Sequence, residues 1–253
     1  MNKFIGIIPA RLASSRFPNK LIKKIHSLPM IEHVRRRSCL VDLIDEVYVV
    51  SNDTEILDLI KNYQGLTIQT YNNHESGTSR MIEAVKEIDY THIVLIQGDE
   101  PLILPSDIEL FLRTINISKS SKEVWNCITR LADEEELVND SVVKCNLNAD
   151  HLIVNCKRKY ENIKDFNEIY ELLGLFVFSK DIIKKYGQLK NTPRQQKESI
   201  EQLKLIENNC KIKSYFLPSK YQSVNQKEDL AKVLEILDKD IIQKRVLRKI
   251  LNL

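Results

Sequence analysis

Phe4-Ile5-Gly6-Ile7-Ile8 is an uninterrupted apolar stretch near the start of the chain, and the polar loop 9–20 follows it. A run of this kind predicts a strand that helices cover on both faces, as in a parallel sheet. Strand and helix patterns alternate outward from it. Further strands are predicted at 46–50, 66–69 and 92–96, and helices at 29–40, 56–60 (with Asp53 as N-cap), 78–88 and 106–115.

This alternation predicts βαβ units and therefore an α/β fold with a mostly parallel, doubly wound sheet. The second half is richer in strand patterns. Its strands are expected at 123–130, 142–146, 152–155, 170–178 and 211–216, with helices at 195–207 and 227–251, the last continuous or broken. Because no linker divides the chain, we expect one domain over 1–253, with a first half 1–120, a second half 121–253 and a smaller β-rich region that is either inserted or appended.

Composition narrows the classes of function. The chain has 253 residues, and 38 Lys+Arg against 35 Asp+Glu leave a net charge of only +3, with the cations dispersed, so nucleic acid is not an expected partner. No apolar stretch approaches the roughly 20 residues that span a bilayer, and no membrane partner is expected. The five cysteines lack metal-site spacing and are expected to be reduced thiols in the cytoplasm.

The loop after the first predicted strand carries three cations, Arg11, Arg16 and Lys20, together with two hydroxyls, Ser14 and Ser15. In an open α/β sheet, ligands bind outside the carboxyl ends of the strands, which is where this loop begins. Guanidinium forks, a Lys ammonium and hydroxyls suit a polyphosphate. A solvated basic loop would explain the same charges, and the glycines of the known phosphate-binding motifs are absent.

Two more polar clusters lie at predicted strand or helix ends. Gln97-Gly98-Asp99-Glu100-Pro101 follows a strand, so that Asp99 is a candidate Mg²⁺ ligand, and Gly98 permits close approach of a ligand to the backbone. A turn with a capping Asp is the alternative. The segment 73–80 contains Ser76-Gly77-Thr78 and Arg80 at a helix start, which suits either an anion or ordinary capping.

These clusters, in this order, resemble the 3-deoxy-manno-octulosonate (Kdo) cytidylyltransferase family, the CMP-Kdo synthetases. The resemblance is carried between residues 4 and 105 by four motifs: Ile8-Pro9-Ala10-Arg11 with Ser15-Arg16, Pro18 and Lys20; Pro29-Met30-Ile31 with His33-Val34; His74 with Ser76-Gly77-Thr78 and Arg80; and Gln97-Gly98-Asp99-Glu100-Pro101. It continues more thinly through Val143-Lys144, Gly174, Glu201-Gln202-Leu203 and Glu228-Asp229-Leu230.

The resemblance implies a nucleotide-diphospho-sugar transferase-like fold and a Mg²⁺-dependent nucleotidyltransferase that joins CTP to an acidic sugar, giving a CMP-sugar and pyrophosphate. It further implies a cytoplasmic homodimer serving lipopolysaccharide biosynthesis, with nucleotide binding in 1–120 and acceptor binding and dimerisation in 121–253. The catalytic residues would be Arg11, Lys20 and Asp99. The nucleotide would be bound by Pro9, Ala10, Arg11, Ser14, Ser15, Lys20, Ser76, Gly77, Thr78, Arg80 and Gln97. The acceptor would be bound by Gln97, Glu201 and Gln202, and the metal by Asp99 and Asn225. His33 is expected to be structural.

The chain departs from the family pattern on the acceptor side. Asn225 stands where the family has a second metal-binding Asp, and it keeps an oxygen ligand but loses the charge. Leu172 and Phe176 stand where the family has a His and an aromatic hydroxyl that contact the sugar, and Asn19 replaces a Gly. The acceptor is therefore expected to be Kdo or a Kdo-like acid. The alternatives are another ulosonic acid or a phosphonate as acceptor, or a CTP- or CMP-binding homologue with reduced turnover.

Overall fold

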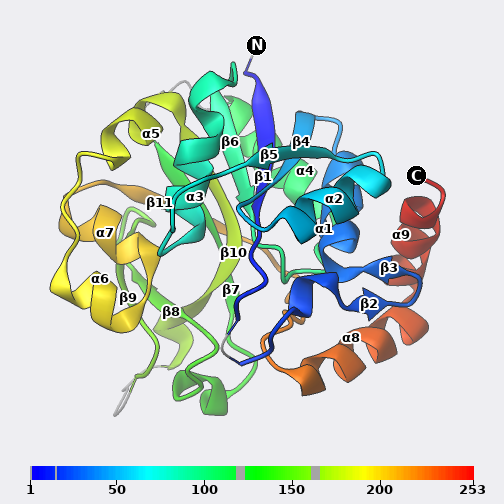
Figure 1. Cartoon of the computed structure of the whole chain (residues 1–253). Coiled ribbons are helices and arrows are strands. Elements are labelled where there is room, and N and C mark those ends of the chain that lie inside the picture. The colour runs from blue at the N-terminus through cyan, green and yellow to red at the C-terminus, as the bar shows by residue number, and fades with distance from the viewer. Residues whose placement is uncertain (1, 15, 118–122, 161–165) are drawn as a thin grey trace. The chain divides into compact units, whose positions relative to one another are not determined.

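The computed structural model of the chain describes residues 2–14, 16–117, 123–160 and 166–253 (Figure 1). Contacts divide these residues into two compact units, each described by itself. Unit 1 comprises Met1–Lys119 and Tyr221–Leu253, and unit 2 comprises Ser120–Lys220. The sequence analysis placed 221–253 with the second half of the chain. Its contacts instead group it with the first, so the β-rich unit is an insertion.

Unit 1 is built on a four-stranded parallel sheet in the order β6-β1-β4-β5. Its strands are β1 (Phe4–Pro9), β4 (Ile44–Ser51), β5 (Leu66–Gln69) and β6 (His92–Ile96). Every residue of β1 and β6 is buried, as the apolar runs predicted for a sheet covered on both sides. The predicted α/β class with a mainly parallel sheet is confirmed.

The helices of unit 1 follow the strands in the predicted order. They are α1 (Met30–Cys39), α2 (Thr54–Asn62), α3 (Gly77–Ala84), α4 (Pro105–Ile117), α8 (Lys227–Lys239) and α9 (Ile241–Leu251), with short 3₁₀ turns η1 (Lys20–Ile22) and η2 (Val85–Glu87). A small hairpin, β2 (Lys24–Ile25) with β3 (Leu28–Pro29), was not predicted, because two-residue strands leave no periodicity. In Figure 1, β1 is blue and α8 and α9 are orange and red.

Unit 2 is a mixed sheet around β7 (Val124–Arg130). β7 pairs antiparallel with β10 (Ile169–Ser179) and parallel with β11 (Ile212–Phe216). β10 also pairs with β8 (Lys144–Leu147), which pairs with β9 (Ile153–Lys157). The helical elements are α5 (Lys180–Tyr186), α6 (Pro193–Glu198), α7 (Glu201–Glu207), η3 (Glu134–Leu137) and η4 (Phe166–Glu168). The sequence analysis did not predict α5.

Two local predictions need correction, and one open alternative is decided. The helix expected at 195–207 is two helices, α6 and α7, separated at Ser199, whose φ of 51° is left-handed. The helix expected at 227–251, continuous or broken, is broken at Asp240, whose carboxylate accepts a hydrogen bond from the Gln243 backbone N–H and caps α9. Cys39, predicted on the apolar stripe of α1, is exposed.

The buried surface of α1 is wider than its apolar stripe, because its charged residues are buried as well. Glu32 is fully buried and forms ion pairs with Arg35 and Arg36, both at 2.6 Å. Arg36 also donates to the backbone carbonyl of Ile250 in α9, at 2.7 Å. The buried pairs thus fasten the C-terminal helix to the first helix of the chain, which explains why contacts group residues 221–253 with unit 1.

Candidate active site

The loop after β1 is held against the sheet by its backbone. Leu12 N–H donates to the Asp53 carboxylate at 2.8 Å, and Ser51 Oγ donates to the Ala10 carbonyl at 3.0 Å. Asp53 lies at the predicted N-cap position of α2, yet its side chain forms no cap hydrogen bond there. It binds the loop instead. Pro9 and Ala10 are buried, Ser14 is half-buried and Arg11 is exposed, while Ser15 lies outside the described residues.

Lys20 lies at the end of this loop, and its ammonium joins two other segments. It donates to Asp99 Oδ2 at 2.5 Å and to the Val224 carbonyl at 2.8 Å. Val224 N–H in turn donates to the Asp99 carbonyl at 3.0 Å. The side chains of Lys20 and Asp99 are 13% and 25% exposed, so the pair remains reachable from solvent. Segments after β1, after β6 and before α8 therefore meet at one place in unit 1.

Asn19 supplies the turn that aims Lys20. Its φ of 58° and ψ of 23° lie in the left-handed region, where glycine is favoured and Asn is tolerated better than most residues. The replacement of the family's Gly by Asn at this position is therefore compatible with the turn. Asn19 N–H also donates to the Leu12 carbonyl at 3.1 Å, which closes the loop on itself.

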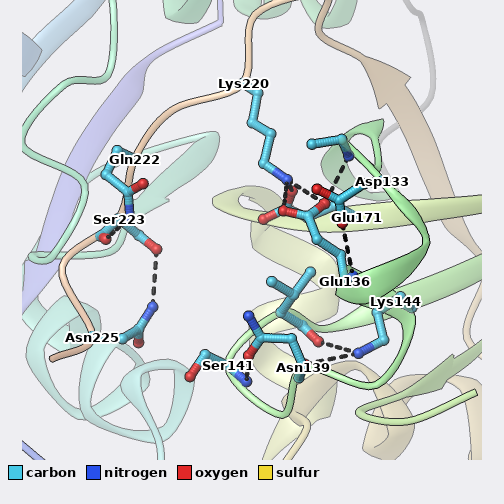
Figure 2. A network of polar contacts seen from close by, with 12 residues as sticks. Asp133, Glu136, Asn139, Ser141, Lys144, Glu171, Lys220, Gln222, Ser223 and Asn225 are labelled. Carbon is cyan, nitrogen blue, oxygen red and sulfur yellow. Dashed lines mark hydrogen bonds and ion pairs between the residues drawn. The ribbon is translucent and has the colours of Figure 1, made fainter. Parts of the chain in front are cut away.

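Asn225 follows Val224 directly, so it adjoins the Lys20–Asp99 pair. Its side-chain nitrogen donates to Ser223 Oγ at 3.0 Å, as Figure 2 shows, and its side-chain oxygen accepts from Arg16 at 3.3 Å. The two predicted metal ligands, Asp99 and Asn225, thus come from segments that are hydrogen-bonded to each other. Within the described part of the chain, no group of three or more His, Cys, Asp and Glu side chains forms a metal site.

The segment before α3 is ordered by capping and by a carboxylate that the sequence analysis missed. Ser76 accepts from Ser79 N–H at 3.1 Å in a capping box. Glu83 accepts hydrogen bonds from Tyr71 N–H, the Asn72 amide and His74. Burial opposes ionisation of Glu83, but these donors outweigh it and lower its pKa to about 2. No motif marks Glu83, because its partners are recognisable only in the folded loop.

Arg80 connects α3 to the end of β5. It is 5% exposed and donates to Thr70 Oγ1 at 2.7 Å. Burial lowers its pKa, Asp53 opposes that shift, and the neighbouring charge of Arg11 adds to it. Thr70 directly follows β5, and β1, β4 and β5 are parallel, so this segment and the loop after β1 lie at the same edge of the sheet. Gly77 begins α3 and Thr78 is buried within it.

Gly98 has a packing role, and the approach of a ligand to its backbone remains a prediction. A Cβ there would lie 3.0 Å from Ile31 Cδ1 and 3.3 Å from Leu21 Cδ2. Gly98 therefore lets the turn after β6 settle on α1 and η1, which fixes the direction of Asp99. Gln97, just before it, is half-buried at the end of β6, and its carbonyl accepts from Glu100 N–H at 3.3 Å.

His33 is fully buried, as expected for a structural residue. Its Nε2 is 2.7 Å from the Ile25 carbonyl, so this nitrogen carries the proton and donates it to the carbonyl oxygen. Burial is the largest influence on its pKa and lowers it to about 4, while the Ile25 hydrogen bond opposes the shift. His33 is therefore neutral near pH 7.

The predicted acceptor residues Glu201 and Gln202 begin α7 in unit 2. Glu201 is half-buried. Gln202 is 4% exposed, and its side-chain nitrogen donates to Asn126 Oδ1 at 2.8 Å. Contact of these two residues with an acceptor remains a prediction.

Unit 2 also holds an ionic network that no sequence motif indicated. Figure 2 shows Lys220 paired with Glu136 and with Glu171, the latter at 2.7 Å. Burial raises the pKa of Glu171 although Lys220 opposes this. Lys144 is fully buried and donates to the carbonyls of Asn139 and Val142 at 2.9 and 2.8 Å. These contacts tie the segment after β7 to β8 and β10.

Comparisons with known proteins identify the family of this chain. The profile of a family described as cytidylyltransferase matches residues 5–213. The 3-deoxy-manno-octulosonate cytidylyltransferase of Fusobacterium nucleatum is 33% identical over 249 residues, covering 95% of this chain and 99% of its own. The enzyme of the same name from Geobacter metallireducens is 30% identical over 251 residues, with coverages of 94% and 98%.

Solved structures give the same result. A CMP:2-keto-3-deoxy-manno-octonic acid synthetase complexed with CTP superposes with a TM-score of 0.85 at 28% identity, covering 94% of this chain and all of that one. An inositol-1-phosphate CTP transferase from T. maritima, at 15% identity and a TM-score of 0.67, covers 94% of this chain and 96% of its own and shares the fold. No helix in the described ranges is long and apolar enough to cross a membrane.

Proposed function

Because this chain belongs to the cytidylyltransferase family, and within it to the 3-deoxy-manno-octulosonate cytidylyltransferases, we propose that it activates Kdo with CTP. The observation that carries the proposal is the meeting of Lys20, Asp99 and the Val224–Asn225 segment beside the cationic loops of unit 1. This arrangement places positive charge and oxygen ligands together at the carboxyl ends of β1 and β6, where an open α/β sheet binds its ligand.

The reaction needs positioning and charge neutralisation. The anomeric hydroxyl of the sugar forms a bond to the α-phosphorus of CTP and gives up its proton, and the bond from that phosphorus to the bridging oxygen breaks. Pyrophosphate leaves with the electron pair. Charge accumulates on phosphate oxygens during this step, so Arg11 and Lys20 stabilise it electrostatically. Ser14, Ser15 and the backbone at Pro9–Ala10 would complete the triphosphate site.

The base and sugar of the nucleotide would be held by the other predicted contacts. The Ser76-Gly77-Thr78 turn, Arg80 and Gln97 lie at the same edge of unit 1 as the loop after β1, which supports a single nucleotide site. In unit 2, the acceptor contacts that we propose are Glu201 and the β10 segment Leu172–Phe176, whereas the buried side chain of Gln202 binds Asn126.

Mg²⁺ is the cofactor that we propose, with Asp99 and Asn225 as its protein ligands. Both offer oxygen atoms, the donors that Mg²⁺ prefers, and a site with one carboxylate suits an ion that takes its other ligands from phosphates and water. Mg²⁺ bound there would neutralise charge on the phosphate oxygens. Lys20, already paired with Asp99 at 2.5 Å, holds this carboxylate in place.

A pyrophosphate-release assay tests the function. The purified protein is incubated with Mg²⁺ and CTP, ATP, GTP or UTP, each with Kdo, other ulosonic acids and phosphonates. We expect release with CTP and Kdo, and formation of CMP-Kdo by mass spectrometry. Calorimetric binding of CTP without pyrophosphate release from any acid would identify a binding protein and contradict the proposal, and release with another acid alone would reassign the acceptor.

The family also suggests a cellular compartment and an oligomeric state for this chain, and both remain proposals. All five cysteines are free, although Cys145 and Cys156 lie opposite each other on β8 and β9, which supports a reducing compartment such as the cytoplasm. We also propose a homodimer that serves lipopolysaccharide biosynthesis. Light scattering coupled to gel filtration tests the dimer, and a mass equal to one chain at assay concentration would contradict it.

A further inference from the structure

The pairing of β7 with β10 is interrupted within the segment assigned to the acceptor. Leu172 pairs with Ile128, and the next registered pair is Phe176 with Asn126. Between these two pairs, β10 therefore has three residues and β7 has only one, Cys127. Such a bulge bends its strand and re-aims the side chains on it. Leu173, Gly174 and Leu175 form the bulge, and Leu172 and Phe176 flank it.

One buried side chain fills this interruption. Asn126 has no exposed surface, and its side-chain nitrogen lies within hydrogen-bond distance of three carbonyls, those of Leu173 at 2.9 Å, Leu175 at 3.2 Å and Cys127 at 2.9 Å. These carbonyls belong to the bulge and to the strand opposite it. A buried amide with this many acceptors fixes the local backbone, because any other arrangement would leave buried polar groups unpaired.

Gln202 fixes the orientation of that amide. Its nitrogen donates to Asn126 Oδ1, so the oxygen of Asn126 faces α7 and its nitrogen faces the bulge. Asn126 and Gln202 are 76 positions apart in sequence, and both are almost completely buried. Hydrogen bonds of this pair therefore connect α7, through β7, to the bulge in β10, and all three elements belong to unit 2.

We propose that Asn126 and Gln202 are positioning residues that set the shape of the bulge at Leu172–Phe176 and thereby the affinity for the acceptor acid. This inference rests on the proposed function, and it assigns Asn126 a role that no motif indicated. Gln202 acts through Asn126, while the bulge presents its neighbouring side chains to the sugar.

Kinetics of three variants test the proposal. Asn126→Leu and Gln202→Met keep side-chain size but remove the amides. We expect each to raise KM for the acid by at least about tenfold, since small displacements of binding groups have large effects, and to leave KM for CTP unchanged. The double variant should match Asn126→Leu alone, because Gln202 acts only through Asn126.

Thr129→Val is the matched control. Thr129 is also a buried polar residue of β7, and its hydroxyl donates to the Leu217 carbonyl at 2.8 Å, away from the bulge. This variant should lower the melting temperature without changing KM for the acid. If the amide variants behave like Thr129→Val, or raise KM for CTP as much as KM for the acid, the proposal is wrong.

Hydrogen exchange of the free protein gives a readout that needs no turnover. The peptide spanning 169–179 should exchange faster in Asn126→Leu and Gln202→Met than in the wild type and in Thr129→Val, and unchanged exchange overturns the proposal. A wild-type protein that releases no pyrophosphate overturns the proposed function. An active wild type whose amide variants keep their acceptor KM overturns only this inference.

Discussion

The ammonium of Lys20 lies 2.5 Å from the carboxylate of Asp99, although 79 positions separate the two residues in sequence. Lys20 ends the loop after β1, and Asp99 follows β6. Because β1 and β6 are adjacent parallel strands, their carboxyl ends lie at the same edge of the sheet, and the two side chains meet there. The pair is the centre of the proposed active site, and most of its contacts can be tested by substitution.

Asp99→Asn removes the charge and keeps the size of the side chain. We expect turnover to fall by about 100-fold or more, since the group acts on charge that develops during the reaction. The melting temperature should change little, because the side chain is partly exposed. Asp58→Asn, in an exposed pair with Lys61 at 3.5 Å, is the control and should keep full activity. Near-normal turnover in Asp99→Asn would exclude Asp99 from catalysis.

Asn225→Asp restores a carboxylate beside Asp99. The number of charged ligands tunes the affinity of oxygen sites for hard cations, so we expect Mg²⁺ to bind the CTP complex more tightly, by roughly tenfold. Titration calorimetry of Mg²⁺ into the protein with CTP measures this. Asn225→Ala should shift the affinity in the opposite direction. Equal affinity in all three proteins would show that Asn225 is not a ligand.

Glu32→Gln leaves the guanidinium groups of Arg35 and Arg36 without their shared carboxylate. Because Glu32 is fully buried and both partners are nearly so, we expect a loss of about 3 kcal/mol or more in the free energy of unfolding. Urea denaturation measures it. Glu235→Gln, which breaks an exposed pair with Lys239, should leave the denaturation midpoint unchanged. Equal midpoints for the two variants would show that the buried cluster contributes nothing.

Burial of His33 should make the free energy of unfolding depend on pH. Its pKa is lowered from an ordinary 6.5 to about 4 in the folded protein, chiefly by burial. Between these values the unfolded chain binds a proton that the folded protein does not, so stability is complete above about pH 6.5 and falls as the pH decreases. The loss reaches about 3 kcal/mol near pH 4.

His33→Gln keeps a donor for the Ile25 carbonyl but cannot titrate. We expect its unfolding free energy, measured in urea between pH 4.5 and 7.5, to depend less on pH than that of the wild type. The variant should be less stable than the wild type at pH 7.5, where the native packing is optimal, and the two curves should converge toward acid. Parallel curves for the two proteins would mean that His33 does not carry this dependence.

Much of unit 1 is predictable from the sequence. The strands at 66–69 and 92–96 were predicted to the residue, and those at 4–9 and 44–51 to within two, whereas the two-residue strands β2 and β3 were not predicted. The three polar clusters were recognisable because each follows a strand or begins a helix. The boundary at Ser199 was missed because a single left-handed residue ends a helix without changing its periodicity.

The contacts that give the clusters their geometry were not predictable in the same way. Asp53 satisfies the rule for an N-cap, yet its carboxylate binds Leu12 N–H, and Gly98 packs against Leu21 and Ile31. Glu83 has no motif, and Asn126 reads as an ordinary strand residue. Each of these roles depends on a segment distant in sequence that brings a donor, an acceptor or a methyl group within reach.

The sequence by itself determined the α/β architecture and the set of cations, hydroxyls and carboxylates at the strand ends, because these follow from apolar periodicity and from local spacing, and its motifs carried the resemblance to the family. The tertiary structure alone decided that Lys20 meets Asp99 and Val224, that residues 221–253 return to unit 1, and that Gln202 donates to Asn126. The physical reason is that apolar periodicity is a property of neighbouring residues. A hydrogen bond between distant residues exists only once the chain has buried its core and fixed the path of every strand.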